Sequence, residues 1–213
     1  MNKRIALPSA LLVAVLCLLA RLAQREPLAS PSSVAVFFSP KGGCTEAVVE
    51  ELQAAGATVL VQAYSFTSTP IAKALVAAHN RGVKVQVILD KSQRTEKYSS
   101  ATFLHNAGVP TFIDAAHSIA HNKVMVIDGQ TVVTGSFNFT TAAEQHNAEN
   151  LLVLRDPSLA DRYAANWRAH LLHSEAYEGP SHGLAEETHD HRQPSETASR
   201  SRSRHRRHVE TLP

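Results

Sequence analysis

The chain has 213 residues, 44% of them hydrophobic, so it is long enough for one domain with a substantial core. Its formal net charge of +2 excludes a body that is strongly charged throughout. Cys17 lies in an apolar leader, which leaves Cys44 as the single thiol of the body and excludes a disulfide within it.

The first 30 residues are expected to be an export signal. Lys3 and Arg4 precede an almost wholly apolar run from Ile5 to Ala20, and small residues follow it. The run is near the upper limit for a signal peptide and short for a membrane span, and a good cleavage box is missing. We expect an exported protein, periplasmic or secreted, with a membrane-anchored protein as the alternative.

Residues 33–178 alternate between strand-like and helix-like patterns and are expected to form one domain. Strands are predicted at 34–39, 57–66, 83–90, 109–113, 122–128, 131–137 and 148–155. Helices are predicted at 45–55, 69–82, 100–108 and 157–173. Thr45 is expected to be the N-cap of the first of these helices. This order predicts an α/β fold in which a mixed β-sheet, partly parallel and partly antiparallel, is sandwiched between helices.

Residues 179–213 contain few apolar side chains and are expected to be a disordered basic tail. The run "RSRSRHRRH" in this tail is dense enough in positive charge to bind nucleic acid or anionic lipid. A solvated tail is the alternative, because the segment also carries several acidic residues. For the "HDH" at 189–191 we expect only adventitious, weak metal binding.

The stretch "IAHNKVMVIDGQTVVTGSFNFT" combines a predicted strand hairpin with an unusual set of polar residues. His121 and Lys123 are two apart in an extended strand and therefore point to the same side. Asp128 and Gly129 form a favoured hairpin turn, which brings Ser136 and Asn138 back to the end of the adjacent strand.

An imidazole, an ammonium, a hydroxyl and an amide are thus expected to converge at one end of a sheet. This set suits a phosphodiester, because it offers a nucleophile or acid and several donors for the nonbridging oxygens. It does not suit a metal, since one histidine and a lysine supply too few ligands. Nor do we expect a clustered set of histidine or carboxylate ligands elsewhere in the body. Asp128 is expected to serve the turn.

The segments "HNKVMVID" and "GQTVVTGSFN" have the form H-x-K-x(4)-D-x(6)-G-S-x-N, which is the signature of the phospholipase D superfamily. The resemblance extends through "AYSFTSTPIAKALVAAHNRGVKVQVILD" and "TGSFNFTTAAEQHNAENLLV", from about residue 33 to 173. The chain most resembles the small exported bacterial endonucleases that carry one copy of this motif. The resemblance implies a phospholipase D-like fold.

It also implies a role for each polar residue. His121 would attack phosphorus and form a phosphohistidine, while Lys123 and Asn138 would hold the phosphate oxygens. Ser136 would be the hydroxyl beside them, and Glu149 a carboxylate that orients a histidine through a hydrogen bond. The aspartate of the motif would be structural. No catalytic metal and no cofactor are implied.

Three functions are compatible with these residues. The first is a metal-independent, non-specific endonuclease that cleaves DNA, with RNA as a further candidate substrate. A phospholipid-hydrolysing phospholipase D would use the same residues and differ in its groove. A non-catalytic nucleic-acid-binding protein would need positive charge but not the complete catalytic set.

A homodimer with a shared active site is expected from counting histidines. In-line displacement needs a nucleophile on one side of phosphorus and an acid on the other, and one histidine cannot occupy both positions. Because the motif occurs once, a twofold dimer would bring His121 from each chain to one site. The alternative is a monomer in which water is the acid.

Overall fold

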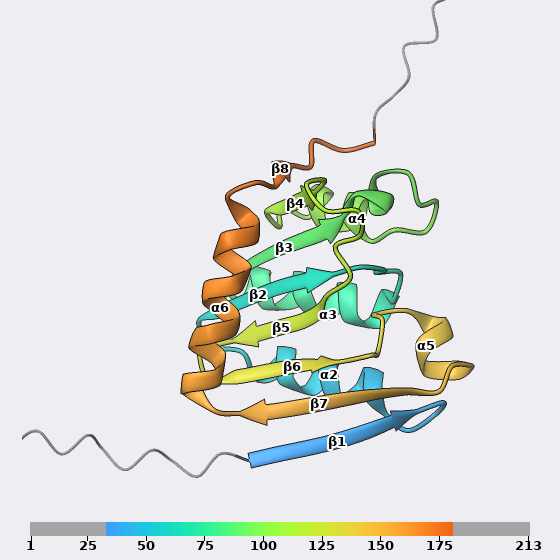
Figure 1. Cartoon of the computed structure of the whole chain (residues 1–213), viewed down its shortest axis with the longest axis vertical. Helices are drawn as coiled ribbons and strands as arrows, with labels where there is room; N and C mark the ends of the chain where they lie inside the picture. The colour runs from blue at the N-terminus through green and yellow to red at the C-terminus, as the bar shows by residue number, and fades with distance from the viewer. Residues whose placement is uncertain (1–32, 181–213) are drawn as a thin grey trace, which may run out of the picture. The chain divides into compact units, whose positions relative to one another are not determined.

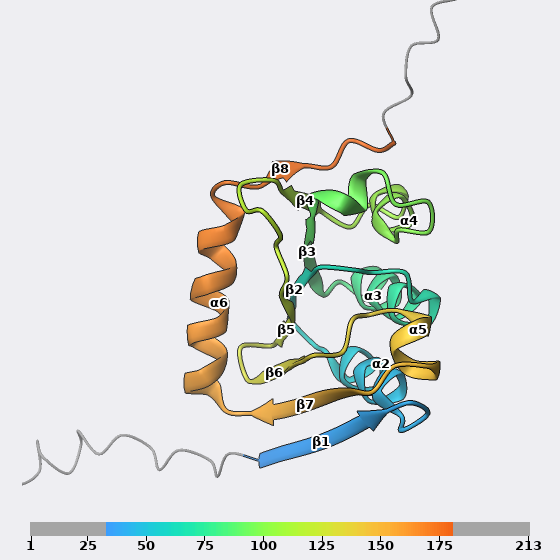
Figure 2. The ribbon, with the colours of Figure 1, turned by 45° about the vertical axis from the view of Figure 1, so that its right-hand side comes forward.

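The computed structural model describes residues 33–180. The expected leader and nearly all of the basic tail lie outside these residues. The described part forms one eight-stranded mixed sheet with helices on both sides, as Figure 2 shows with the sheet seen more nearly edge-on. The predicted α/β sandwich is therefore confirmed.

The sheet contains the seven predicted strands and an eighth strand, β8, which is the last along the described chain and lies at one edge of the sheet (Figure 1). The strands are β1 (Ser33–Ser39), β2 (Thr58–Ala63), β3 (Lys84–Asp90), β4 (Thr111–Asp114), β5 (Lys123–Ile127), β6 (Thr131–Gly135), β7 (Glu149–Arg155) and β8 (Glu175–Ala176). The helices are α2 (Cys44–Ala54), α3 (Thr69–Asn80), α4 (Ala101–Asn106), α5 (Thr141–Gln145) and α6 (Pro157–Leu171), with a 3₁₀ turn η1 (Lys91–Arg94). The elements α5, η1 and β8 were not predicted, because they are too short to show a periodic pattern.

The order of strands across the sheet is β1-β7-β6-β5-β2-β3-β4-β8. Strands β2, β3 and β4 are parallel to one another, whereas every other pair of neighbouring strands in this sheet is antiparallel. Strand β5 pairs with β2, so that Lys123 lies opposite Ala63 and Met125 opposite Val61. The hairpin that carries the motif is therefore in the middle of the sheet.

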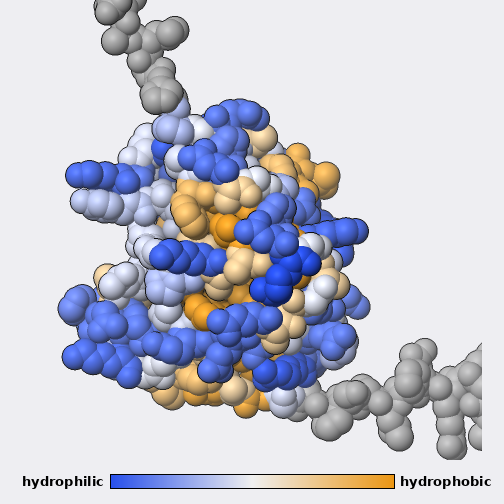
Figure 3. Space-filling view, turned by 180° about the vertical axis from the view of Figure 1, so that it is seen from behind, coloured by the Kyte–Doolittle hydropathy of each residue, from blue (hydrophilic) through white to orange (hydrophobic). Residues whose placement is uncertain are grey.

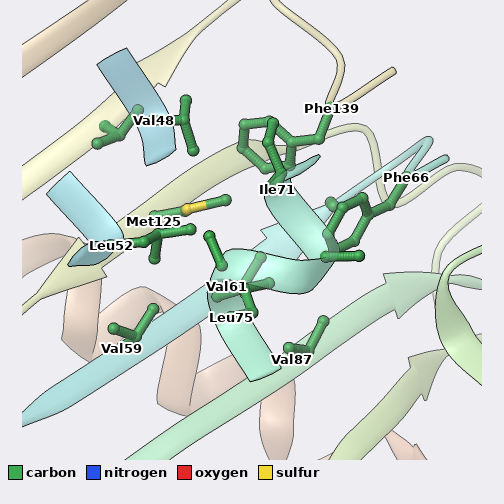
Figure 4. Packing of buried hydrophobic residues seen from close by; sticks show 14 of the residues in the cluster. Val48, Leu52, Val59, Val61, Phe66, Ile71, Leu75, Val87, Met125 and Phe139 are labelled. Atoms are coloured by element: carbon green, nitrogen blue, oxygen red, sulfur yellow. The ribbon is translucent and has the colours of Figure 1, made fainter. Parts of the chain in front are cut away.

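The larger part of the core lies between the sheet and helices α2 and α3 (Figure 4). Val61 and Met125 pack there with Leu52 of α2 and Leu75 of α3, and all four side chains are buried. Burying each of these large apolar side chains contributes about 1.5–3 kcal/mol. The opposite face of the sheet is covered by α6.

Strand β5 illustrates how both faces are filled. Met125 belongs to the core under α2 and α3, whereas Val124 and Val126 pack with Ala160 and Ala164 of α6. All five residues of β5 are buried, which explains why the sequence of this strand reads as a continuous apolar run after its lysine.

The start of α2 differs from the prediction. Thr45 lies inside the helix, and the N-cap is Gly43, whose φ of 81° is in the left-handed region. The buried carboxylate of Glu144, from α5, accepts the N–H groups of Gly43 at 3.3 Å and of Thr45 at 2.7 Å. The prediction that Thr45 is the N-cap was wrong, because the acceptor for these N–H groups is Glu144, which is 99 positions from Thr45 in the chain.

The surface on the side opposite to that of Figure 1 is mixed. Figure 3 shows hydrophilic side chains around and between apolar patches on this side. Among residues 33–180, no helix has both the length and the apolar character needed to cross a membrane.

Asp128 holds the β5–β6 hairpin to the start of β2. Its φ of 54° and the φ of 64° at Gly129 fit a hairpin turn with two left-handed residues. The carboxylate also accepts the N–H groups of Gly56 at 2.9 Å, Ala57 at 2.8 Å and Thr58 at 2.8 Å. Burial raises the pKa of Asp128, but these three hydrogen bonds outweigh it and lower the pKa below the ordinary value.

We predict that Asp128→Asn lowers the free energy of unfolding by about 1–3 kcal/mol at pH 7, because hydrogen bonds to a charged acceptor are lost. Asparagine tolerates the left-handed turn, so the substitution removes the charge and one of the two accepting oxygens without disturbing the backbone. Since the folded-state pKa is lowered, the difference should be complete above about pH 4 and shrink as pH falls through the lowered pKa. Urea unfolding of both proteins at several pH values measures this difference in free energy of unfolding. Equal stability at pH 7 would contradict the proposed role of the Asp128 carboxylate.

Candidate active site

The polar residues of the motif lie at the strand ends of the sheet, on the side where β2 ends and β5 begins. Lys123 is the first residue of β5 and lies opposite Ala63, the last residue of β2. Glu149 begins β7, and Ser136 directly follows β6. Antiparallel pairing of β5, β6 and β7 places these three positions at one edge. Asp128 lies beyond the opposite end of β5, away from this group.

His121 and Lys123 are in direct contact. The Nζ atom of Lys123 is 3.0 Å from Nε2 of His121 and donates to the backbone carbonyl of His121 at 2.8 Å. An ammonium group has only donors, so Nε2 accepts the hydrogen bond and carries a lone pair. The imidazole is exposed, whereas Lys123 is buried. An unprotonated ring nitrogen is therefore held at the surface beside a fixed positive charge.

Burial sets the properties of Lys123. Removal from water lowers the pKa of its ammonium, and the negative charge of Glu149 offsets only part of this effect. A buried ammonium costs free energy unless it is compensated, so this position destabilises the fold in order to keep a charge at the site.

Tyr64, the residue directly after β2, supports the pair and was not among the predicted site residues. Its ring centroid is 4.6 Å from that of His121, and Lys123 Nζ lies 5.1 Å from the same ring. The backbone N–H of Tyr64 donates to the carbonyl of Asn122 at 2.9 Å, which ties this residue to the start of β5. Nothing in the local pattern distinguishes this tyrosine from a core residue, because its partners come from another strand.

The Gly-Ser pair of the motif depends on a close backbone approach. A Cβ atom on Gly135 would lie 2.3 Å from the carbonyl oxygen of Asn150, and its φ is 148°, so only glycine fits. The next residue, Ser136, accepts hydrogen bonds at Oγ from the backbone N–H of Asn150 at 3.1 Å and from its side chain at 3.3 Å. Its own hydroxyl hydrogen remains free to donate.

Asn138 is positioned by its neighbours. Phe137 and Phe139 are fully buried on either side of it. The Oδ1 atom of Asn138 is buried and finds no hydrogen-bond partner among the described residues. The two buried phenylalanines anchor the backbone that carries Asn138, whose amide offers both donors and an acceptor.

Glu149 is expected to orient a histidine through a hydrogen bond, and this role stays a prediction. In the described part of the chain its carboxylate accepts from the side chain of Asn147 at 3.2 Å and forms no hydrogen bond with His121. Strand β6 separates β7 from β5, so Glu149 influences the site through its charge on Lys123.

Asp90 is a second residue that sequence analysis did not single out. Its buried carboxylate accepts the N–H of Ala120 at 2.7 Å, directly before His121, and the N–H of Ser92 at 2.9 Å. Burial raises the pKa of Asp90, but these bonds outweigh it and lower the pKa. The residue therefore fixes the backbone that leads into His121.

The expectation that the body holds no cluster of histidine and carboxylate ligands is wrong. Asp114, His117, His170 and His173 each offer one ligand atom, and these atoms all lie within 4.8 Å of one another. The prediction failed because β4 and the end of α6 meet only in the folded chain. Two signals were present: an aspartate and a histidine three residues apart, and a histidine pair with the same spacing.

Comparison with known proteins places this site in a family. Residues 48–171 match the model described as "Cardiolipin synthase, PLD-like domain". The chain is 43% identical over 141 residues to a phospholipase D of Rickettsia typhi, covering 66% of this chain and 69% of that protein.

Two solved structures have the same fold. The phospholipase D family member Nuc from Salmonella typhimurium is 38% identical with a TM-score of 0.67, covering 69% of this chain and 99% of that one. NucT from Helicobacter pylori covers 69% of this chain and 100% of that one, with 24% identity and a TM-score of 0.64. The fold and the matched motif together define a phosphodiesterase. The chain belongs to the phospholipase D superfamily.

We predict that Lys123→Met raises the free energy of unfolding by about 1 kcal/mol at pH 7, because a buried charge is replaced by an apolar side chain of similar length. The pKa of Lys123 is lowered in the folded state, so the unfolded chain binds the proton more tightly. The free energy of unfolding of the wild type should therefore rise relative to that of the variant as pH approaches the ordinary lysine pKa of about 10.4.

Chemical unfolding at neutral and alkaline pH measures this effect. Lys73→Met, at an exposed position of α3, is the matched control and should change stability little. A loss of stability in Lys123→Met comparable to that of a core truncation would show that the ammonium stabilises the fold.

Proposed function

We propose that this phosphodiesterase is an endonuclease that cleaves DNA through a phosphohistidine formed on His121. The observation that carries the proposal is the 3.0 Å contact between Lys123 Nζ and the exposed Nε2 of His121. A nucleophile needs an available lone pair, and a phosphodiester needs positive charge beside its nonbridging oxygens. In this contact the Nε2 lone pair accepts from Lys123. Transfer of that hydrogen bond to a nonbridging oxygen of a bound phosphodiester would free the lone pair for attack and keep the positive charge beside the substrate.

The reaction proceeds in two displacements. Nε2 of His121 attacks phosphorus and a P–O bond of the backbone breaks, so that the leaving oxygen takes a proton from an acid on the opposite side. A water molecule then attacks the phosphohistidine, gives its proton to that same group, and restores free His121. Lys123 and the amide of Asn138 donate to the nonbridging oxygens in both steps. Because Lys123 supplies the positive charge, the proposed chemistry assigns no role to a metal ion.

Nucleic acid is favoured as substrate by the single motif and by the resemblance to exported endonucleases that carry it. Phospholipid is the second candidate, because the Rickettsia typhi relative is named phospholipase D. Both substrates present the same phosphodiester to His121. The two substrates differ only in the groups attached to the phosphodiester. A direct assay of each substrate therefore distinguishes an endonuclease from a phospholipase.

We predict that His121→Gln lowers cleavage of supercoiled plasmid DNA on the order of 10⁴-fold, as loss of a nucleophile does in other enzymes. The wild-type enzyme quenched in alkali during turnover should carry phosphate on His121. His79→Gln, which alters a histidine in the last turn of α3, should leave the rate unchanged.

The same preparations are assayed on vesicles of phosphatidylcholine and of cardiolipin. Headgroup release without DNA cleavage would replace the nuclease by a lipid phosphodiesterase and leave the role of His121 intact. Cleavage of either substrate by His121→Gln at the wild-type rate would refute the nucleophile.

We further propose that the acid opposite His121 is His121 of a second chain. Of the other histidines in residues 33–180, three surround Asp114, and none is hydrogen-bonded through its ring to a lysine. A twofold axis beside the exposed His121 would pair two equivalent imidazoles across one phosphate, which a symmetric dimer achieves with a single motif.

Mixed dimers test this arrangement. A dimer of one wild-type and one His121→Gln chain, purified through two different tags, is expected to have almost no activity, because each shared site lacks one imidazole. Independent sites would give about half of the wild-type turnover, as expected when each chain carries a complete set of groups. A fully active monomer in sedimentation under assay conditions would also rule out the shared site.

A further inference from the structure

Four side chains converge where the end of β4 meets the end of α6. Asp114 is the last residue of β4 and is completely buried. His117 lies in the turn that follows β4, His170 in the last turn of α6, and His173 directly after that helix. These positions are brought together by folding, and the proposed phosphodiester chemistry uses none of them.

The ring nitrogens point at one carboxylate. Nδ1 of His170 lies 2.8 Å from Oδ2 of Asp114, Nδ1 of His117 3.1 Å from it, and Nε2 of His173 3.4 Å. Zinc binds nitrogen and oxygen at about 2.0–2.1 Å, so neighbouring ligands of a tetrahedral ion are about 3.3 Å apart. The spacing around Asp114 therefore already matches that between zinc ligands, and the histidines need to approach one another only modestly.

A hydrogen-bonded cluster without metal is the competing explanation. A neutral imidazole has one N–H, and each of the three rings could donate it to Asp114. Together with the N–H of Ala116, three such donors would use all of the roughly four acceptor sites of the carboxylate. The ring centroids are 4.9–5.3 Å apart, so the three rings also lie close to one another. A cation offers the three rings a common partner for their lone pairs. It is also favoured by the negative end of the α6 dipole, at which His170 lies.

The surroundings hold the ligands in place. The backbone N–H of Ala116 donates to Oδ1 of Asp114 at 3.1 Å; Oδ1 is also 3.1 Å from Nδ1 of His117, and Oδ2 lies within 3.4 Å of all three rings. Lys91 donates to the carbonyl of His117 at 2.9 Å, and the hydroxyl of Ser174 donates to the carbonyl of His170 at 2.8 Å. Such bonds restrict the ligand-bearing turns before any metal arrives.

We propose that Asp114, His117, His170 and His173 form a structural zinc site. Three imidazoles and one carboxylate are ligands that zinc accepts, and four protein ligands close a tetrahedral site with no position left for substrate. Zinc here would join the C-terminal end of α6 to the end of β4. It would also fix the start of the segment that leads from His117 to His121. The proposal does not depend on the substrate proposed above.

The test uses the full chain, purified without an affinity tag that binds metal and dialysed against a weak chelator. Wild-type protein should retain one equivalent of zinc per chain by elemental analysis, and cobalt added to the metal-free protein should give the intense visible absorption of a tetrahedral site. Since zinc would bind only the folded state, the midpoint of thermal unfolding should rise with zinc concentration.

His173→Ala is the decisive variant, because His173 lies after the helix, is partly exposed, and leaves the core untouched. It should weaken zinc affinity by more than about 100-fold, since even the partners of metal ligands contribute 10–100-fold. Asp114→Asn should remove the cobalt spectrum as well.

Two controls separate this site from other histidines. The pair His79→Ala/His105→Ala alters two histidines of the helical layer, and the pair His189→Ala/His191→Ala alters the "HDH" segment. Both should retain zinc and the thermal shift. The proposal is overturned if the wild type binds no more zinc than His173→Ala, or if zinc is lost only when "HDH" is altered. Equal zinc-dependent shifts of the unfolding midpoint in wild type and His173→Ala would also overturn it, and the four residues would then be a hydrogen-bonded cluster without metal.

Discussion

The antiparallel pairing of β5 with β2 is the constraint on which the site depends. It inserts the hairpin into the middle of the sheet, beside three parallel strands, and sets Lys123 opposite the last residue of β2. Tyr64 then meets His121, and the burial of β5 on both faces carries Lys123 out of water. A register shift of one residue would turn Lys123 toward α6 and separate it from this group, so the apolar alternation that fixes the register also fixes the chemistry.

Three carboxylates connect segments that are distant in sequence through hydrogen bonds to backbone N–H groups. Asp128 binds three backbone N–H groups ahead of β2, Glu144 caps α2, and Asp90 holds the backbone before His121. Each accepts N–H groups that would otherwise lack partners, which is worth more than a surface ion pair because the acceptor is charged and at least partly buried. The motif aspartate thus acts on the fold, at the opposite end of β5 from the phosphate chemistry.

The segment between β4 and β5 is restrained at both ends. It begins at the Asp114 cluster and ends where Asp90 holds Ala120, next to the proposed nucleophile. A nucleophile on a connecting segment needs such restraint, because a displacement of about 1 Å can cost two orders of magnitude in rate. The same segment therefore links a candidate structural metal to the reacting imidazole without placing the metal in the reaction.

Local sequence determined the elements, the hairpin turn and the motif. Alternation and apolar runs are properties of consecutive residues, and they predicted the seven main strands, the four longer helices and the edge at which His121, Lys123 and Ser136 lie. The tertiary structure alone decided what depends on contacts between distant segments. Glu144 rather than Thr45 accepts the N–H groups at the start of α2, Tyr64 lies against the histidine, and the charge of Glu149 acts on the pKa of Lys123. Asp114 and the three histidines around it come from the ends of β4 and α6 and the residues that follow them. No spacing in the chain encodes the proximity of these ends, because only packing on a common sheet brings them together.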